Sequence, residues 1–274
     1  MAQEYLSTDK KKVTATRLLN MKGVEKIAMV TCYDYTSALL ADASGIDALL
    51  VGDSASNTML GNDTTLPITM EEMITFTKPV AKAARHAFVV ADMPFGSVHG
   101  DSRDALKNAI RMMKETGADA IKVEGGTAVI DSIKLILGAG IPVVGHLGLT
   151  PQSIPRLGGY GVQGRGEAAA AHLLSEARKL DEAGICALVL EKIPSSLART
   201  VTEAVSVPTI GIGAGPYTDG QVLVFQDMLG LNRSFSPKFL RRFANLGDEI
   251  ISAFDSYAEA VKGGSFPTLD ESYE

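Results

Sequence analysis

The sequence contains no tryptophan and only two cysteines among its 274 residues. Cys32 and Cys186 lie far apart in apolar surroundings and show no C-x-x-C spacing, so we expect neither a disulfide framework nor a zinc site. The chain has no run of about 18 apolar residues, the length that a membrane-spanning helix needs. Its first residues, MAQEYLSTDKKK, include no apolar segment of the signal-peptide kind. We therefore expect a reduced, cytoplasmic protein without a membrane partner.

Basic residues are also in deficit, since Lys and Arg total 26 against 32 Asp and Glu, which gives a formal net charge of −6. Nucleic-acid-binding proteins neutralise phosphates with clustered Lys and Arg. Here the one basic run is Lys10–Lys12, which is more typical of a solvated approach to a helix. We therefore expect no nucleic-acid partner. The apolar content of 46% excludes a disordered chain.

Short apolar runs recur along the chain, and each ends in a polar or glycine-rich turn. Continuous rather than alternating hydrophobicity is typical of strands that are covered on both faces, as in parallel sheets. Helical stretches fill the gaps between the runs, without a linker or a shift in composition. The expected strands are Lys26–Thr31, Asp47–Gly52, Ala87–Ala91, Ala120–Val123, Pro142–Gly145, Ala187–Leu190, Thr209–Ile212 and, less clearly, Gln221–Phe225.

Several helix ends can be read from the sequence. Thr69 and Glu72 have capping-box spacing, and Pro79 should bend the helix that follows or stop it early. The next helix is expected to begin at a Ser102 cap and to run to Glu115, ahead of a glycine. A further amphipathic helix is predicted over Glu167–Ala183, again ending at a glycine.

Two architectures fit repeated strand–helix units: a closed (β/α)8 barrel and an open, doubly wound sheet. A dinucleotide-binding sheet should carry its glycine fingerprint after the first strand, where this chain has Cys32–Tyr35. The glycine-dense segment Gly211–Gly215 comes late and is followed by Pro216 and Tyr217 rather than by a helix entry. We therefore predict an α/β fold with a single (β/α)8 TIM barrel over residues 1–274, with an N-terminal helical extension and a C-terminal helical tail.

Almost every expected strand ends on a polar or ionisable residue. In a (β/α)8 barrel, catalytic groups lie at the carboxyl ends of the strands and on the loops that follow. Strand ends are exposed and often polar in any case, and a carboxylate there often only caps the following helix. That explanation is less convincing for five strand ends that converge at one end of the barrel and carry acids and a histidine. The residues are Asp53, Ser54, Asp92, Lys122, Glu124, His146 and Glu191.

Strand geometry indicates which of these side chains share a face. Side chains alternate in direction, so Lys122 and Glu124 point the same way, as do Ala187, Val189 and Glu191. A Lys and a Glu that face the inside of an apolar barrel need partners, because an unpaired buried charge is costly. A divalent metal and an anionic substrate would supply both partners.

An all-oxygen set of acids suits a hard cation such as Mg²⁺. Zinc is disfavoured because the four histidines show no ligand spacing. A hard cation over an α-keto acid polarises its carbonyl and favours loss of a neighbouring proton to a carboxylate base. Lys122 would balance the substrate's charge. The spacing alone leaves the roles of metal ligand and base interchangeable among the acids.

Nine short blocks, each weak alone, are highly specific when they stand in register. They are Met29–Tyr35, Val51–Ser54, Thr64–Pro67, Ala91–Phe95, Lys122–Gly126, Gly145–Gln152, Gly158–Tyr160, Val162–Gly166 and Ile210–Gly215. In this order they resemble the ketopantoate hydroxymethyltransferase family, and the likeness covers most of the chain.

The resemblance implies a barrel of the phosphoenolpyruvate/pyruvate type. It also implies a Mg²⁺-dependent transfer of a one-carbon unit from 5,10-methylenetetrahydrofolate to 3-methyl-2-oxobutanoate, giving 2-dehydropantoate on the route to pantothenate. Members of the family form homo-oligomers, commonly decamers. The family's metal ligands fall on Asp53, Asp92 and Glu124, its keto-acid contacts on Asp53, Ser54, Asp92, Lys122 and, as a further contact, His146, and its catalytic base on Glu191.

Three other interpretations remain open. The chain could be a lyase or mutase acting on another small α-keto acid, although such enzymes usually need a nucleophile or acid, often a cysteine, on a mobile loop. It could be an inactive barrel kept as a binding or assembly protein, although no proposed site residue is missing. Gly211–Gly215 could cradle a phosphate in a sugar-phosphate isomerase, or it could only provide tight packing where the seventh strand ends.

Overall fold

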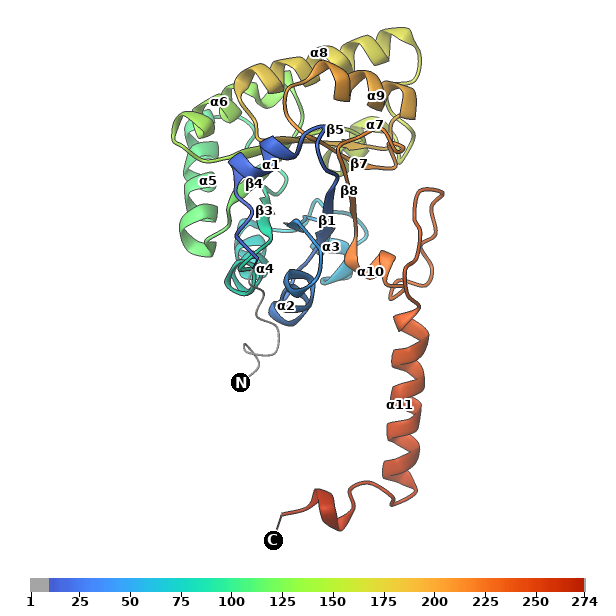
Figure 1. The fold of residues 1–274 in the computed structure, drawn as a ribbon. Helices are drawn as coiled ribbons and strands as arrows, with labels where there is room; N and C mark the ends of the chain where they lie inside the picture. Colours follow the sequence, from blue (N-terminus) through green and yellow to red (C-terminus); the bar gives the residue numbers. More distant parts are fainter. Residues whose placement is uncertain (1–9, 274) are drawn as a thin grey trace. The chain divides into compact units, whose positions relative to one another are not determined.

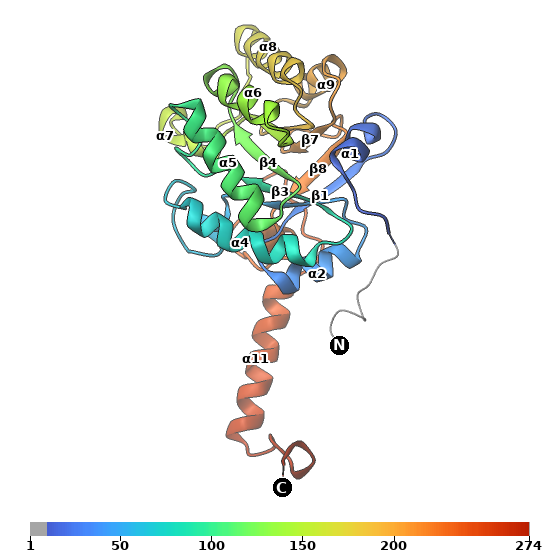
Figure 2. The same ribbon diagram turned by 90° about the vertical axis from the view of Figure 1, so that its left-hand side faces the viewer.

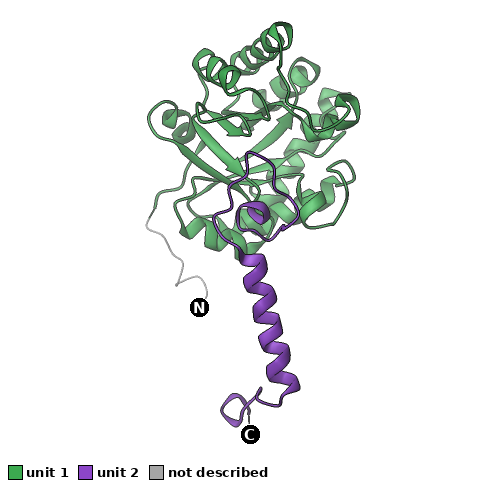
Figure 3. Ribbon diagram, turned by 90° about the vertical axis from the view of Figure 1, so that its right-hand side faces the viewer, with its two compact units in different colours: residues 1–224 green, residues 225–274 purple. Residues whose placement is uncertain are grey.

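A computed structural model describes residues 10–273 of the chain. The chain divides into two compact units, Met1–Val224 and Phe225–Glu274, which Figure 3 shows in different colours. The first unit contains every strand of the described chain, and the second is built from helices and loops. The expectation of one domain over residues 1–274 stays a prediction.

Eight parallel strands of the first unit form a closed barrel in sequence order, and β8 pairs with β1 to complete it. This confirms the (β/α)8 barrel and excludes the open sheet. Every expected strand is present, although β5 runs three residues further than predicted. The strands are β1 (Ile27–Thr31), β2 (Ala48–Val51), β3 (Phe88–Asp92), β4 (Ala120–Glu124), β5 (Val143–Gly148), β6 (Ala187–Glu191), β7 (Thr209–Ile212) and β8 (Gly220–Leu223).

Helices surround the strands in the first unit, as Figures 1 and 2 show from two sides. The longer helices are α2 (Tyr35–Ala43), α4 (Met70–Ala83), α5 (Ser102–Thr116), α6 (Ile130–Gly138), α8 (Glu167–Ala183) and α9 (Ser195–Ala204). Shorter ones are α1 (Ala15–Met21), α3 (Ala55–Thr58), η1 (Thr127–Val129), η2 (Pro151–Ser153) and α7 (Ile154–Leu157). Helices on the outside explain why the strands are apolar on both faces.

The helix after Thr69 begins as predicted, and of the two outcomes expected at Pro79, a bend or an early stop, the early stop does not occur. The Thr69 hydroxyl accepts from the N–H of Glu72, and the Glu72 carboxylate accepts from the N–H of Thr69, which completes the capping box. An early stop at Pro79 is wrong, because α4 continues to Ala83. Thr77, Val80 and Ala83 are buried around the proline. This packing outweighs the single backbone hydrogen bond that Pro79 removes.

The cap predicted for the following helix is wrong by one residue. Asp101, not Ser102, is the N-cap of α5, and its carboxylate accepts from the N–H of Arg103 at 2.7 Å. The two glycine ends are confirmed, since Gly117 (φ 78°) and Gly184 (φ 94°) close α5 and α8 in the left-handed conformation.

The inside of the barrel changes character along its axis. Near the amino ends of the strands the core is apolar, with Ile27, Ala48, Phe88 and Ala120 packed together with side chains of α1. Side chains two residues further along each strand point into the barrel as well. On β3, β4, β5 and β6 this inward row ends in charged or polar side chains. The sequence thus builds a sealed apolar end and a polar end in one barrel.

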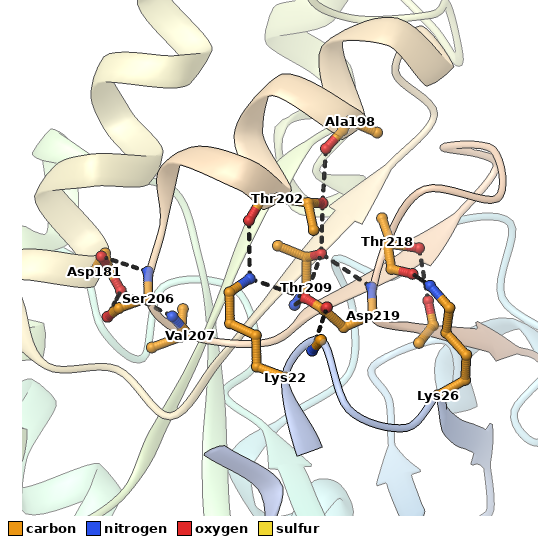
Figure 4. A network of polar contacts seen from close by, with 12 residues as sticks. Lys22, Lys26, Asp181, Ala198, Thr202, Ser206, Val207, Thr209, Thr218 and Asp219 are labelled. Atoms are coloured by element: carbon orange, nitrogen blue, oxygen red, sulfur yellow. Dashed lines mark hydrogen bonds and ion pairs between the residues drawn. The ribbon is translucent and has the colours of Figure 1, made fainter. Parts of the chain in front are cut away.

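The buried carboxylate of Asp219, immediately before β8, connects several segments of the chain through hydrogen bonds (Figure 4). Asp219 accepts hydrogen bonds from the main-chain N–H of Thr209 at 2.9 Å and of Gly23 at 3.1 Å. It also pairs with Lys22 Nζ at 3.1 Å, and this ammonium donates to the carbonyl of Thr202 at 2.9 Å. The network connects the segment after α1 with α9, β7 and β8.

The second unit comprises α10 (Phe225–Met228), α11 (Leu246–Lys262) and η3 (Leu269–Glu271). Within this unit, the N–H of Phe243 donates to the carbonyl of Met228 at 2.7 Å. No residue of α11 is buried. Among residues 10–273, no helix is both long enough and apolar enough to cross a membrane. The exposed apolar side chains of α11 are Ile250, Ile251, Phe254, Tyr257 and Val261.

Candidate active site

The strand register brings the predicted site residues together at the carboxyl end of the barrel. Each lies on the inward row of its strand or on the first residues after it. Neighbouring strands therefore place their polar ends opposite one another. The facing pairs are Asp92 and Lys122, Glu124 and His146, and Gly148 and Glu191.

The turn after β2 places Asp53 against the end of β3. Asp53 is buried, and its main-chain N–H donates to Asp92 Oδ2 at 2.9 Å. A Cβ atom at Gly52 would lie 2.7 Å from Ser54 Oγ and 3.5 Å from Asp92 Oδ2. A side chain at position 52 would therefore displace the Ser54 hydroxyl, whereas its contact with Asp92 would be an ordinary one.

Lys122 is the cation at the centre of the cluster. Its Nζ lies 2.7 Å from Asp92 Oδ1 and 3.7 Å from Glu124 Oε1, and all three side chains are buried. Burial alone would lower the pKa of Lys122, but the charges of Asp92, Glu124 and Asp53 outweigh it and raise that pKa. Lys122 is therefore charged at neutral pH.

One ammonium does not neutralise three carboxylates. Burial, together with the charges of Glu124 and Asp92, raises the pKa of Asp53 well above its ordinary value. Burial also raises the pKa of Asp92, against the opposing effect of Lys122. For Glu124, burial would raise the pKa, but Lys122 and His146 lower it overall. Burial and mutual repulsion thus disfavour the ionised forms of these carboxylates, and a further cation would stabilise those ionised forms.

His146 lies between two carboxylates of the site. Its Nδ1 is 3.3 Å from Glu124 Oε1, and its Nε2 is 3.5 Å from Glu191 Oε2. Burial and Lys122 lower the pKa of His146, but the adjacent carboxylates of Glu124 and Glu191 outweigh both and raise it to about 9. The same Nδ1 lies 3.1 Å from Lys122 Nζ, and Nε2 makes no hydrogen bond within the described residues, so His146 meets the two carboxylates as a close neighbour. His146 thereby connects the buried cluster to Glu191.

Glu191 lies at the accessible edge of the site, with 20% of its side chain exposed. Its carbonyl accepts from the N–H of Leu149 at 2.8 Å. The next residue, Lys192, has a φ of 50° and is the one non-glycine residue with positive φ among residues 10–273. Strained backbone of this kind is concentrated at functional sites. Here it is located immediately after the predicted base.

The site contains two further residues that could not be identified from the sequence. Tyr33 is buried, and its hydroxyl lies 2.8 Å from Ser54 Oγ. Gln152 is buried beside Asp53 and Glu124. Both belong to sequence blocks that carry the family resemblance. Neither residue could be identified from the sequence pattern. Each is uncharged, so it does not require a partner of opposite charge at a predictable position.

A family model described as ketopantoate hydroxymethyltransferase matches residues 12–269. The chain belongs to this family. It is 57% identical over 266 residues to 3-methyl-2-oxobutanoate hydroxymethyltransferase of Parabacteroides distasonis, with 97% of each chain covered. It is 56% identical over 270 residues to the enzyme of the same name from Porphyromonas gingivalis, which covers 98% of this chain and 99% of the relative. As a member of the ketopantoate hydroxymethyltransferase family, the chain is a transferase.

Solved structures of lower identity share the fold. 2,3-Dimethylmalate lyase, a member of the PEP mutase/isocitrate lyase superfamily, aligns with a TM-score of 0.59 at 17% identity and covers 96% of this chain and 92% of its own. Phosphonopyruvate hydrolase aligns with a TM-score of 0.62 at 11% identity and covers the same shares. These similarities show that the chain shares the fold of these barrels.

The donor chemistry of the cluster fits the Mg²⁺ ion that the family resemblance implies. Carboxylate oxygens are hard ligands, and Mg²⁺ usually takes one or two of them together with water and substrate oxygens. In the part of the chain that the structure describes, no three His, Cys, Asp or Glu side chains form a ready-made metal cage. A site for Mg²⁺ does not require one. The convergence of three buried carboxylates, Asp53, Asp92 and Glu124, is the observation that fits a divalent cation.

Other sequence features have structural explanations. A Cβ at Gly215 would lie 2.4 Å from Ser195 Cβ, and one at Gly211 would lie 2.8 Å from Thr218 Oγ1. Close packing therefore accounts for these two glycines, and phosphate binding by the Gly211–Gly215 loop stays untested. Cys32 and Cys186 are free and buried, as expected, and neither lies exposed on a loop as a lyase nucleophile would.

Proposed function

We propose that the chain transfers a hydroxymethyl group from 5,10-methylenetetrahydrofolate to 3-methyl-2-oxobutanoate, giving 2-dehydropantoate for pantothenate synthesis. Membership of the ketopantoate hydroxymethyltransferase family supports the reaction. The observation that carries the assignment of residues is the contact chain from the buried Asp92–Lys122 pair through Glu124 and His146 to Glu191. It joins a charged binding cluster to an accessible carboxylate.

Asp53, Asp92 and Glu124 would hold Mg²⁺ in this proposal. When bound, Mg²⁺ would polarise the 2-oxo group of the keto acid and so make the C3 proton more acidic. Lys122 provides positive charge in a buried environment, where it attracts the substrate carboxylate and the charge that develops during proton loss. Ser54, held by Tyr33, would donate a hydrogen bond to the keto acid.

Glu191 would act as the base. Its carboxylate removes the proton from C3 of the keto acid, and the resulting carbanion attacks the methylene carbon of the folate. Water supplies the hydroxyl group, and tetrahydrofolate leaves with the methylene–nitrogen bonds broken and its nitrogens protonated. His146 Nε2, which lies 3.5 Å from Glu191 Oε2, would orient this carboxylate.

The experiment that tests this function incubates the protein with 3-methyl-2-oxobutanoate, with and without Mg²⁺ and 5,10-methylenetetrahydrofolate. We expect 2-dehydropantoate and tetrahydrofolate in equal amounts, only when both additions are present. Cleavage of the keto acid without folate would instead indicate a lyase. Binding of the keto acid without any conversion would indicate an inactive barrel.

We also propose that the protein is a cytoplasmic homo-oligomer, commonly a decamer in this family. The exposed apolar side chains along α11 support assembly, because contiguous exposed apolar surface usually marks an interaction site. Light scattering of the purified protein measures the oligomer's mass. A monomer at micromolar concentration would contradict this part of the proposal.

A further inference from the structure

The segment that follows β5 contacts the carboxylate cluster through one residue. Gln152 lies in the three-residue helix η2, directly after Pro151, and only 5% of it is exposed. It belongs to none of the predicted ligand or base sets. Buried polar atoms usually have hydrogen-bond partners, and here the side-chain nitrogen and the main-chain N–H of Gln152 have them, whereas Oε1 has none among the described residues.

The side chain of Gln152 donates two hydrogen bonds. Nε2 lies 2.9 Å from Asp53 Oδ2 and 3.0 Å from the carbonyl oxygen of Met93. Both partners are acceptors, so the nitrogen and not the oxygen of the amide must face them. Both Nε2 hydrogens are thereby used. One of them fixes a single oxygen of Asp53.

The main chain of the same residue holds a second carboxylate. The N–H of Gln152 donates to Glu124 Oε2 at 3.0 Å. The first N–H groups of a helix have no partner within that helix, which leaves this one free to donate outward. Glu124 Oε1, the other oxygen, accepts no hydrogen bond in the described structure and faces His146 at 3.3 Å.

We propose that Gln152 is a positioning residue that orients the carboxylates of Asp53 and Glu124 for a divalent cation. It binds one oxygen of each carboxylate from outside the set of charged groups, which restricts the rotation of both. The main-chain N–H of Asp53 in turn donates to Asp92, which places the third carboxylate beside the two that Gln152 contacts. Hydrogen bonds of this kind around metal ligands typically change metal affinity by about 10–100-fold.

The inference rests on the proposed Mg²⁺ site, and its test is metal binding rather than turnover. Gln152→Met retains the size of the side chain and the main-chain bond to Glu124 but removes the bond to Asp53. Gln221→Met is the matched control, because Gln221 Nε2 also donates two hydrogen bonds, to Gly215 O and Thr218 Oγ1, away from the carboxylates. Mn²⁺ alone is titrated and followed by electron paramagnetic resonance.

We expect the dissociation constant for Mn²⁺ to rise about tenfold or more in Gln152→Met and to stay unchanged in Gln221→Met. Saturating metal should restore most of kcat in Gln152→Met. If this variant does not fold, Gln152→Asn replaces it, since its shorter amide cannot reach both acceptors. Wild-type Mn²⁺ affinity in the folded variant would overturn the inference. Failure of the wild-type protein to bind Mn²⁺ would instead overturn the proposed metal site, and the inference with it.

Discussion

The main-chain N–H of Asp53 donates a hydrogen bond to Asp92 Oδ2 at 2.9 Å. The other oxygen of Asp92 lies 2.7 Å from Lys122 Nζ. Asp92 therefore has two roles. It accepts a hydrogen bond from the turn that contains Asp53, and it balances the charge of the buried Lys122 ammonium. This relationship makes the geometry of one acid depend on the charge of the next.

Asp92→Asn should impair metal binding, turnover and stability together. The variant retains the shape of the side chain but leaves Lys122 without its closest anion. Loss of one partner from a buried pair typically costs about 3–5 kcal/mol of unfolding free energy. Mn²⁺ titration and urea unfolding measure the two effects.

The control for this substitution is Asp104→Asn, because Asp104 forms an exposed pair with Lys107 at 2.8 Å. Its unfolding midpoint and metal binding should change little. An unchanged metal titration in Asp92→Asn would remove Asp92 from the predicted ligand set.

Tyr33→Phe tests the contact that holds Ser54. The substitution removes the hydroxyl that lies 2.8 Å from Ser54 Oγ and keeps the buried ring. A single neutral hydrogen bond contributes about 1 kcal/mol, so we expect KM for the keto acid to rise several-fold with a smaller change in kcat. Steady-state kinetics at saturating folate separates the two constants. A fall in kcat at constant KM would contradict the role given to Tyr33.

Gly148→Ala should displace Glu191. Gly148 has a φ of 97°, and a Cβ there would lie 2.2 Å from the main-chain oxygen of Glu191. A shift of about 1 Å at a catalytic group can cost about 100-fold in rate, so we expect kcat to fall at least tenfold. Gly158→Ala is the matched control, because Gly158 has a φ of 73° and no atom within 4 Å of its Cβ position. Equal activity in the two variants would show that Glu191 tolerates the shift.

Asp219→Asn should destabilise the barrel without affecting metal binding. Burial would raise the pKa of Asp219, but the N–H of Thr209 and the charge of Lys22 outweigh it and lower that pKa below its ordinary 3.8. A lowered folded-state pKa means that the carboxylate stabilises the fold above about pH 4 and that this stability is lost as the pH falls through the folded-state pKa. We expect a loss of about 2 kcal/mol at pH 7.

Urea unfolding at pH 7 and at pH 3 measures this effect. The difference between wild type and Asp219→Asn should be clear at pH 7 and smaller at pH 3. A difference that does not depend on pH would contradict the electrostatic origin of the stabilisation.

The barrel could be predicted because its strands repeat one physical signal, a continuous apolar run that ends on a polar residue. The two-residue period of a strand also placed Lys122 and Glu124 on one face, as the structure confirms. The sequence pattern predicts the end of β5 too early, at Gly145, because the segment from His146 to Gly148 interrupts the apolar run. Backbone pairing with β6 extends the strand through these residues.

The contacts of Gln152 and Tyr33 could not be predicted from the sequence. Tyr33 lies in a loop and Gln152 in the three-residue helix η2, so no periodicity gives the direction of either side chain, and their roles depend on partners far away in the chain. The contact from Gln152 to Asp53 spans 99 residues. Local preference also could not identify the N-cap of α5, since Asp101 and Ser102 are both of residue types that are good N-caps.

Proton removal from C3 of 3-methyl-2-oxobutanoate by Glu191 is the central claim. Exchange of this proton with deuterium from solvent, followed by NMR in the presence of Mg²⁺ and without folate, tests it most directly. The wild-type protein and Glu182→Gln, which alters an exposed glutamate on α8, should both catalyse exchange. Glu191→Gln should bind the keto acid and catalyse no exchange, whereas exchange at the wild-type rate in this variant would contradict the account.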